Sequence, residues 1–120
     1  MYRSAACALV LAVLSSPPGA MQAGAVSVRD ATGRMVEIRD TGRVISIGGA
    51  VTEIFYALGL DDRIVAVDTT SLFPPSALKT KPNVGYMRQL SPEGVLGLSP
   101  TLIVAAEGAG PKEAIAVLDN

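Results

Sequence analysis

The sequence predicts an α/β fold in which a short β-hairpin precedes a parallel sheet. Residues 26–39 alternate apolar and polar side chains on either side of a turn sequence, which is typical of an antiparallel hairpin. From residue 43 onward, short apolar segments alternate with stretches of helical periodicity. Because apolar strands joined by helices form parallel sheets with right-handed crossovers, this order predicts a parallel sheet.

The first 25 residues are expected to be a signal peptide. Arg3 supplies a positive charge, and residues 5–14 form an apolar run that is long enough for a signal peptide but too short to span a bilayer. The small residues Ala23–Ala25 predict cleavage before Val26, with a cut two residues earlier or a buried N-terminal helix as alternatives. We therefore expect a periplasmic protein without stable membrane insertion after cleavage. Its only cysteine, Cys7, would leave with the signal peptide, so no disulfide is expected.

The mature chain, residues 26–120, is expected to form a single lobe. Val26–Asp30 and Met35–Arg39 are the predicted hairpin strands. Three apolar segments are predicted as strands buried on both faces, at residues 43–47, 63–67 and 101–105. Three helices are predicted at residues 51–58, 91–98 and 112–118.

Local signals support the predicted ends of these helices. Gly59 is a good C-terminal stop for the first helix. Ser91 can cap the second helix, Pro92 fits its first turn, and Pro100 ends it. Asp61 with Asp62 reads as a polar turn, and residues 68–90 are expected to form a loop rich in Pro and Lys. A three-stranded sheet is thin for an α/β domain, so we expect the sequence to be truncated relative to a complete fold.

The composition favours a binding module over an enzyme. Apolar residues make up 49% of the chain and charged residues 18%, so a packed core is expected. The net charge of -1 does not suggest nucleic acid as a partner. The chain has no histidine, which removes the commonest general base and every Ser–His or Cys–His pair. It also lacks a G-x-S-x-G elbow and a complete phosphate-binding fingerprint.

Tyr86 and Arg88 are the candidate ligand-binding residues. They lie in the loop before the second predicted helix, near the sheet edge where α/β folds place ligands, and Gly85 lets the backbone turn there. A phenolate is a hard oxygen donor that suits ferric iron, and tyrosine is a known axial ligand of haem. The metal or a nearby cation such as Arg88 would have to help the phenol ionise. The alternative is a half-buried loop tyrosine beside a solvated arginine.

Other polar residues have simpler interpretations. Gly48–Gly49 is expected to be a tight strand–helix turn rather than a dinucleotide site, because the G-x-G-x-x-G pattern is absent. Glu53 is expected to be a surface carboxylate. Lys79 and Lys81 are expected to be solvated, although they could meet an anionic ligand.

Four segments together resemble the N-terminal lobe of the periplasmic binding proteins for haemin, cobalamin and ferric siderophores. They are RVISIGGAVTEIFYALGL (43–60), RIVAVDT (63–69), VGYMRQLSPEGVLGL (84–98) and PTLIVA (100–105). The third segment is the most specific and resembles the haemin branch. The resemblance implies one lobe of a two-lobed α/β protein that holds its ligand between the lobes and delivers it to an ABC importer. It covers nearly all of the mature chain but about the first half of the family's length.

The resemblance also implies roles for individual residues. Tyr86 would ligate haem iron, and Arg88 would contact the phenolate or a propionate. Glu113, with Glu107 in reserve, would dock on an arginine of the inner-membrane permease, which works with an ATPase. A cobalamin or ferric-siderophore binder, and a truncated non-functional product, remain alternatives. The absence of histidine in the chain counts against the zinc and manganese branch.

Overall fold

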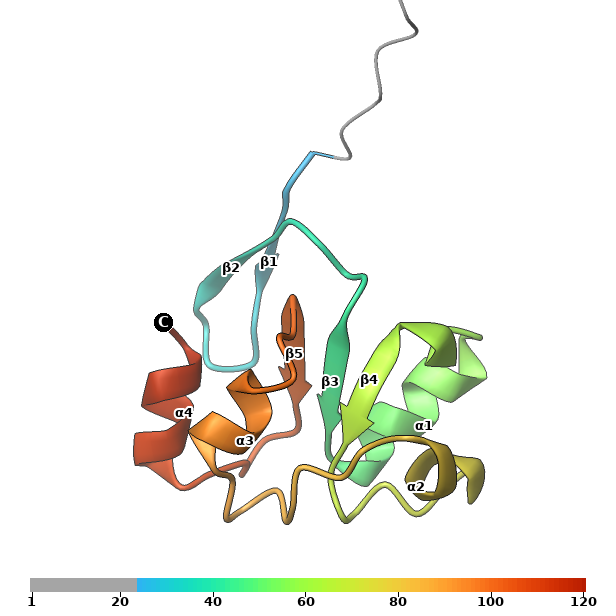
Figure 1. The fold of residues 1–120 in the computed structure, drawn as a ribbon. Helices are drawn as coiled ribbons and strands as arrows, with labels where there is room; N and C mark the ends of the chain where they lie inside the picture. The colour runs from blue at the N-terminus through green and yellow to red at the C-terminus, as the bar shows by residue number, and fades with distance from the viewer. Residues whose placement is uncertain (1–23) are drawn as a thin grey trace, which may run out of the picture.

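A computed structural model describes residues 24–120, in which a three-stranded parallel sheet is flanked by helices and by a separate hairpin (Figure 1). This arrangement confirms the predicted α/β fold with a preceding hairpin. The expected signal peptide, up to its cleavage site, falls almost entirely outside the described residues and stays a prediction. Within residues 24–120, no helix has the length and apolar character needed to cross a membrane.

The hairpin consists of β1 (Val26–Arg29) and β2 (Met35–Ile38), which pair antiparallel. Its turn is organised by Asp30, whose carboxylate accepts 2.9 Å hydrogen bonds from the backbone N–H groups of Thr32 and Arg34. The hydroxyl of Thr32 also donates to this carboxylate, and it is the main reason why the pKa of Asp30 lies below its ordinary value. Arg34 forms a 2.6 Å ion pair with Asp119, which joins the hairpin turn to the end of the last helix.

The sheet has the order β4-β3-β5, with β3 (Val44–Ile47) between β4 (Ile64–Val67) and β5 (Leu102–Ala105). All four residues of β3 are buried, as predicted for a strand covered on both faces. The same prediction is wrong for β5, whose residues are half-buried or exposed. β5 is an edge strand with no further strand beyond it in the described residues, whereas β4, the other edge strand, is flanked at Val67 by the segment around Asn83 and stays mostly buried.

The first helix, α1 (Gly49–Ala57), connects β3 to β4 and ends where the sequence predicts. Gly59 adopts a left-handed φ of 68°, and the N–H of Leu60 bonds to the carbonyl of Phe55 at 2.9 Å, which closes the helix in a Schellman arrangement. The polar Asp61–Arg63 segment after it forms one 3-10 turn.

The remaining helices are short. α3 (Pro92–Leu96) begins as predicted, with the Ser91 side chain accepting a bond from the N–H of Gly94, and α4 (Lys112–Leu118) has the predicted bounds. α2 (Ser76–Thr80) is a helix in the segment that was expected to be a loop. It follows two prolines and is only five residues long, so its apolar period is too brief to read from the sequence.

The apolar core cluster lies on one face of the sheet, the face to which Ile45 and Ile47 point. Ile45 and Ile47 of β3, Ala66 of β4 and Val95 of α3 are fully buried and belong to one apolar cluster. In Figure 1, α1 and α2 lie on the β4 side of the sheet, whereas α3, α4 and the hairpin lie on the β5 side. All three strands point the same way, so the loops that follow them meet at one edge, the carboxyl edge of the sheet.

Candidate ligand site at the carboxyl edge

Tyr86 lies at this carboxyl edge, at the start of a tight turn. The N–H of Gln89 donates a 2.8 Å hydrogen bond to the carbonyl of Tyr86, so residues 86–89 form a hydrogen-bonded turn. Gly85 precedes the turn with a left-handed φ of 95°, which confirms its expected role. Tyr86 is 44% exposed.

The backbone before Tyr86 is held against the end of β4. The N–H of Val67 donates to the carbonyl of Pro82, and the N–H of Val84 donates to the carbonyl of Val67, which makes a short parallel bridge. Beyond the strand, the N–H of Thr69 donates to the carbonyl of Gly85 at 2.9 Å. The segment therefore continues the sheet for a few residues and delivers Tyr86 to its edge.

The backbone after Tyr86 is held by the loop between β5 and α4. The N–H of Gly110 donates to the carbonyl of Met87, and the N–H of Leu90 donates to the carbonyl of Gly110, both at 2.9 Å. Gly110 is itself buried. The Tyr86 turn is thus fixed on both sides by main-chain hydrogen bonds from two different loops of the carboxyl edge.

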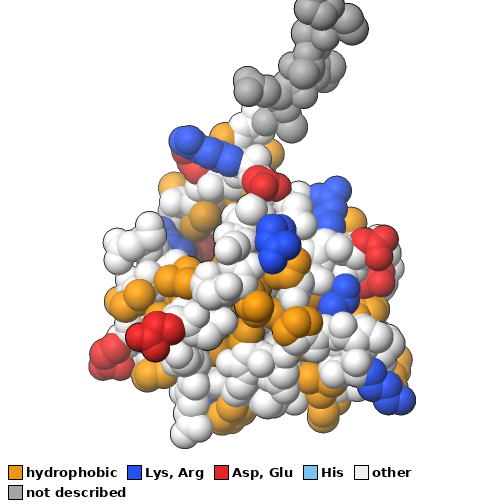
Figure 2. Space-filling model, viewed as in Figure 1, with side chains coloured by type: hydrophobic (Ala, Val, Ile, Leu, Met, Phe, Trp, Pro, Cys, Tyr) orange, Lys and Arg blue, Asp and Glu red, His pale blue; other side chains and the backbone are white. Residues whose placement is uncertain are grey.

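Arg88 is exposed on the same turn. Among residues 24–120, neither its guanidinium nor the Tyr86 hydroxyl takes part in a side-chain hydrogen bond or ion pair with the protein. Figure 2 shows apolar side chains at the lower rim of the molecule, the side on which the carboxyl ends of the strands lie in Figure 1. The described part of the chain holds no cluster of three or more His, Cys, Asp or Glu that could bind a metal ion.

A buried carboxylate, Asp68, organises the loops behind the Tyr86 turn. Asp68 directly follows β4 and is fully buried. It accepts hydrogen bonds from the backbone N–H of Gly48 at 2.8 Å and from the hydroxyl and N–H groups of Thr70. Ser71 donates its hydroxyl to the same carboxylate at 3.1 Å.

Sequence reasoning missed this network, because it treated Asp68 only as the first residue of a loop. An available signal was the order Asp-Thr-Thr-Ser directly after a buried strand, since Asp and Thr in such positions bond to nearby backbone groups. Two further hydroxyls extend the network into the core: Ser71 bonds to Thr52 at 2.7 Å, and Thr52 bonds to Ser46 at 2.8 Å.

The Gly48–Gly49 pair is a tight strand–helix turn, as expected. Gly48 adopts a left-handed φ of 109°, and a Cβ added there would lie 2.6 Å from the Cβ of Ala106. A Cβ added at Gly49 would lie 2.5 Å from the carbonyl oxygen of Thr70. The N–H of Gly49 donates to the Thr70 hydroxyl, so this N–H at the start of α1 is already bonded within the chain.

The remaining charged candidates lie apart from this turn or are exposed. Glu113 is exposed in the first turn of α4, and Glu107 is exposed in the loop before it. Lys79 is exposed, as expected, but the expectation is wrong for Lys81. The ammonium group of Lys81 donates a 2.9 Å hydrogen bond to the carbonyl of Asp61 and is partly buried. It therefore joins the segment after α2 to the segment after α1.

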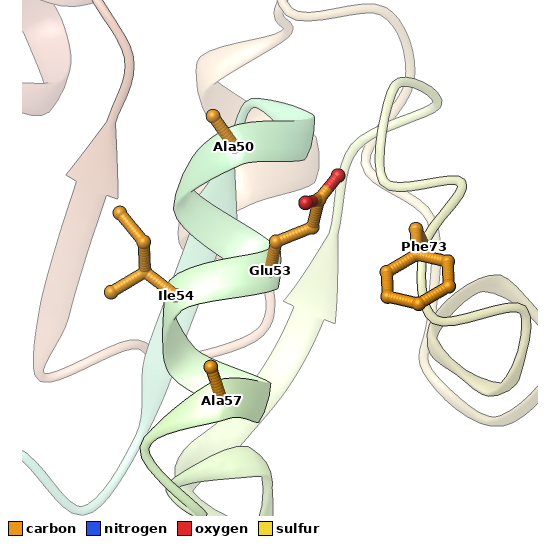
Figure 3. Close-up of a pocket in the computed structure, with 5 residues that line it drawn as sticks. All are labelled: Ala50, Glu53, Ile54, Ala57 and Phe73. Carbon is orange, nitrogen blue, oxygen red and sulfur yellow. The ribbon is translucent and has the colours of Figure 1, made fainter.

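An open, mostly apolar groove lies on the outer side of α1, between this helix and Phe73 (Figure 3). Glu53 points toward the Phe73 side of the groove and contributes its only charge among the lining residues, whereas Ile54 points the other way. Glu53 is exposed, in agreement with its interpretation as a surface carboxylate.

Comparison with known proteins identifies the family of this chain. The profile of the periplasmic binding protein family matches residues 44–118, a range that includes the Tyr86 turn. A curated vitamin B12-binding protein of Yersinia pestis is 41% identical over 70 residues, which cover 58% of this chain and 25% of that protein.

Solved structures give a related result. A periplasmic heme-binding protein from Roseiflexus sp. RS-1 is 44% identical, with a TM-score of 0.63, over 67% of this chain and 30% of that one. A periplasmic heme-binding protein from Pseudomonas aeruginosa is 45% identical, with a TM-score of 0.61, over 65% of this chain and 28% of that one. The chain thus spans between a quarter and a third of the length of the relatives named here, which corresponds to one lobe.

Proposed function

We propose that this chain, which belongs to the periplasmic binding protein family, forms a lobe that binds haem for an iron importer. The family is one of binding proteins and not of enzymes. In this proposal the first 25 residues direct export, and the lobe works in the periplasm. Haem is the cargo, and an ABC permease in the inner membrane is the acceptor.

The observation that carries the proposal is the exposed phenol of Tyr86 at the carboxyl edge. Its backbone is fixed on both sides, whereas its hydroxyl has no protein partner among residues 24–120. A rigidly held donor loses little conformational entropy when it binds a ligand. A phenolate oxygen is an established axial ligand of ferric haem. Arg88, two residues on, supplies a positive charge that favours the phenolate or pairs with a propionate.

Haem is preferred here over cobalamin because of the similar solved structures and because Tyr86 is exposed at the carboxyl edge. Several solved structures that resemble the chain are described as heme-binding proteins, with identities of 44% and 45% in the two cases given above. The curated relative is described as a vitamin B12-binding protein, so cobalamin is the second candidate. The two ligands differ in their use of Tyr86, because ferric haem needs an axial oxygen whereas cobalamin would be held mainly by shape and stacking.

Titration with haemin tests the proposal directly. Haemin added to the purified chain should give a high-spin ferric spectrum with a charge-transfer band, and Tyr86→Phe should lose this band and bind more weakly. Tyr56→Phe, which removes a hydroxyl from the half-buried Tyr56 of α1, is the matched control and should behave like the parent chain.

Affinity should be modest, because a single lobe can bury only part of the porphyrin surface. A chimera that joins residues 26–118 to the second lobe of the Pseudomonas aeruginosa relative should bind more tightly while keeping the Tyr86 dependence. An unchanged spectrum in Tyr86→Phe would refute the role of this phenol. Tight binding of cyanocobalamin that is indifferent to Tyr86→Phe would favour the second candidate.

Glu113 is the proposed docking residue for the permease, with Glu107 as the reserve. Glu113 is exposed in the first turn of α4, so its carboxylate is available to a partner. In the two-lobed chimera, Glu113→Ala should slow haem uptake by cells and leave haemin affinity nearly unchanged, since surface charges act mainly on encounter and orientation. An equal fall in haemin affinity would show that this carboxylate serves the ligand instead.

A further inference from the structure

We infer that Asp68 is the positioning residue of the Tyr86 turn, acting through Thr69 and Gly85; the inference rests on the function proposed above for Tyr86. Asp68 touches no ligand in this assignment. It fixes the backbone of residues 68–71, and the N–H of Thr69 in that segment holds the carbonyl of Gly85, which directly precedes Tyr86. The chain of contacts therefore runs from a buried carboxylate to the candidate iron ligand through two backbone groups.

The hydrogen-bond inventory shows why a carboxylate is needed at this position. Both oxygens of Asp68 face donors: the N–H of Gly48 and the hydroxyl of Ser71 on one oxygen, and the N–H of Thr70 on the other. The Thr70 hydroxyl lies within 3.0 Å of both oxygens. Among residues 24–120, no cation forms an ion pair with this carboxylate. An ionised carboxylate only accepts, so it can satisfy every one of these donors, which an amide in its place could not do.

The same inventory fixes the direction of each hydroxyl proton. The Thr70 hydroxyl donates to Asp68 and so is free to accept the N–H of Gly49 at 2.9 Å. Ser71 also donates to Asp68, so in the Thr52–Ser71 contact the proton must come from Thr52. Because Thr52 has then used its proton, the Ser46 hydroxyl must donate in the last contact. The network thus ties β3, α1 and the loop after β4 in one arrangement, from which Thr69 reaches Gly85.

This arrangement positions Tyr86 from one side only. On the other side, Gly110 bonds to Met87 and Leu90 without any contribution from the Asp68 network. Loss of Asp68 should therefore release one anchor of the turn and leave the other in place. A change in general stability alone would instead loosen both anchors equally.

Amide hydrogen exchange on the purified chain separates these two cases without any ligand. In Asp68→Ala, exchange at the N–H of Thr69 should accelerate at least about tenfold relative to exchange at Gly110, equivalent to about 1.4 kcal/mol of local opening. Should this variant fail to fold, Thr70→Val removes only the bridging hydroxyl and should give the same selective acceleration. Thr70→Ser keeps the hydroxyl and should restore protection.

Thr101→Val is the matched control, because it removes a threonine hydroxyl that accepts the N–H of Arg43 at the opposite, amino edge of the sheet. It should not change the ratio of exchange at Thr69 to exchange at Gly110. The inference would be overturned if exchange accelerated equally at Thr69 and Gly110 in both Asp68→Ala and Thr70→Val. It would also be overturned if the ratio of exchange at Thr69 to exchange at Gly110 were the same in Thr70→Val as in Thr101→Val.

Haemin titration of the same variants then connects the anchor to the ligand. Thr70→Val should weaken haemin binding several-fold and shift the charge-transfer band, while Thr70→Ser and Thr101→Val keep it. Selective exchange at Thr69 with an unchanged haemin spectrum would refute a positioning role for Asp68. If the parent chain fails to bind haemin at all, the proposed function fails by itself, and the exchange ratio still decides whether Asp68 anchors the turn.

Discussion

Gly49→Ala is expected to destabilise the protein, although alanine is normally favoured over glycine in a helix. Gly49 is the first residue of α1, and it has no positive φ that would disfavour a side chain. The obstacle is space, because the new Cβ would lie 2.5 Å from the carbonyl oxygen of Thr70, short of the 3.0 Å that real Cβ atoms keep. The obstructing atom belongs to the backbone of the Asp68 segment and cannot simply rotate away.

The size of the effect follows from two opposing contributions. Replacing glycine by alanine at a compatible helical site stabilises by about 0.4–1 kcal/mol. Overpacking against an ordered neighbour costs about 1–3 kcal/mol, and here the backbone shift also strains the Gly49–Thr70 hydrogen bond. The net loss should be about 1–2 kcal/mol, which lowers Tm by about 4–8 °C per kcal/mol in a domain of about 60–100 residues.

Thermal unfolding followed by circular dichroism measures this shift, and Gly94→Ala provides the control. Gly94 lies inside α3, and a Cβ there would come no closer than 3.7 Å to the Ser91 side chain. Gly94→Ala should therefore raise Tm, because the space and the helical backbone both accept a methyl group. If Gly49→Ala has a Tm equal to or above that of the parent chain, the close approach of Thr70 to the start of α1 is wrong.

Two further predictions concern the core and the hairpin. Ile45→Ala in β3 should lower the free energy of unfolding by about 2–5 kcal/mol in urea titrations, because Ile45 is fully buried. Ile54→Ala, at a position that is 59% exposed, should change this free energy by about 0.5 kcal/mol or less. Similar losses in the two variants would contradict the burial pattern. The lowered pKa of Asp30 means that its turn contributes stability above the ordinary value of 3.8, and that this contribution is lost as the pH falls through the lower, folded pKa. Unfolding midpoints of the parent chain and Asp30→Asn should thus differ near neutral pH and converge in acid, and a difference that persists at about pH 2 would speak against the turn geometry.

The elements that the sequence predicted correctly are those with strong local signals. The periodicity of α1 with its Gly59 stop, the Ser91 and Pro92 start of α3, and the apolar run of β3 all depend on neighbours in the chain. The low exposure expected for β5 was wrong because burial depends on what covers each edge strand: the segment around Asn83 flanks β4, and no comparable bridge flanks β5 in the described residues. Such coverage comes from distant parts of the chain and cannot be predicted from the strand's own sequence.

The same distinction applies to the site. Gly85 could be read as a turn from its own chemistry, and Tyr86 as a ligand from its chemistry and a family resemblance. The role of Asp68 could not be read in this way, since its donors come from Gly48, Thr70 and Ser71, and one of these lies twenty residues earlier in the chain. Lys81 was misread for a similar reason, because its partner is the backbone carbonyl of Asp61.

The pairing of the Tyr86 turn with Gly110 has a consequence for how freely this edge can change in evolution. Both hydrogen bonds join main-chain atoms, so the side chains of Met87 and Leu90 do not take part in them. Leu90 is buried in the apolar core and Met87 packs against it, so the freedom to vary lies with the exposed Arg88 and Gln89 between them. Mutations at Arg88 and Gln89 can therefore alter the surface that a ligand meets while the turn keeps its place beside the loop that leads into α4. The one substitution that these bonds forbid at Leu90 is proline, because it would remove the donated N–H. Relatives that accept different cargo could thus vary the chemistry of this turn on an unchanged frame.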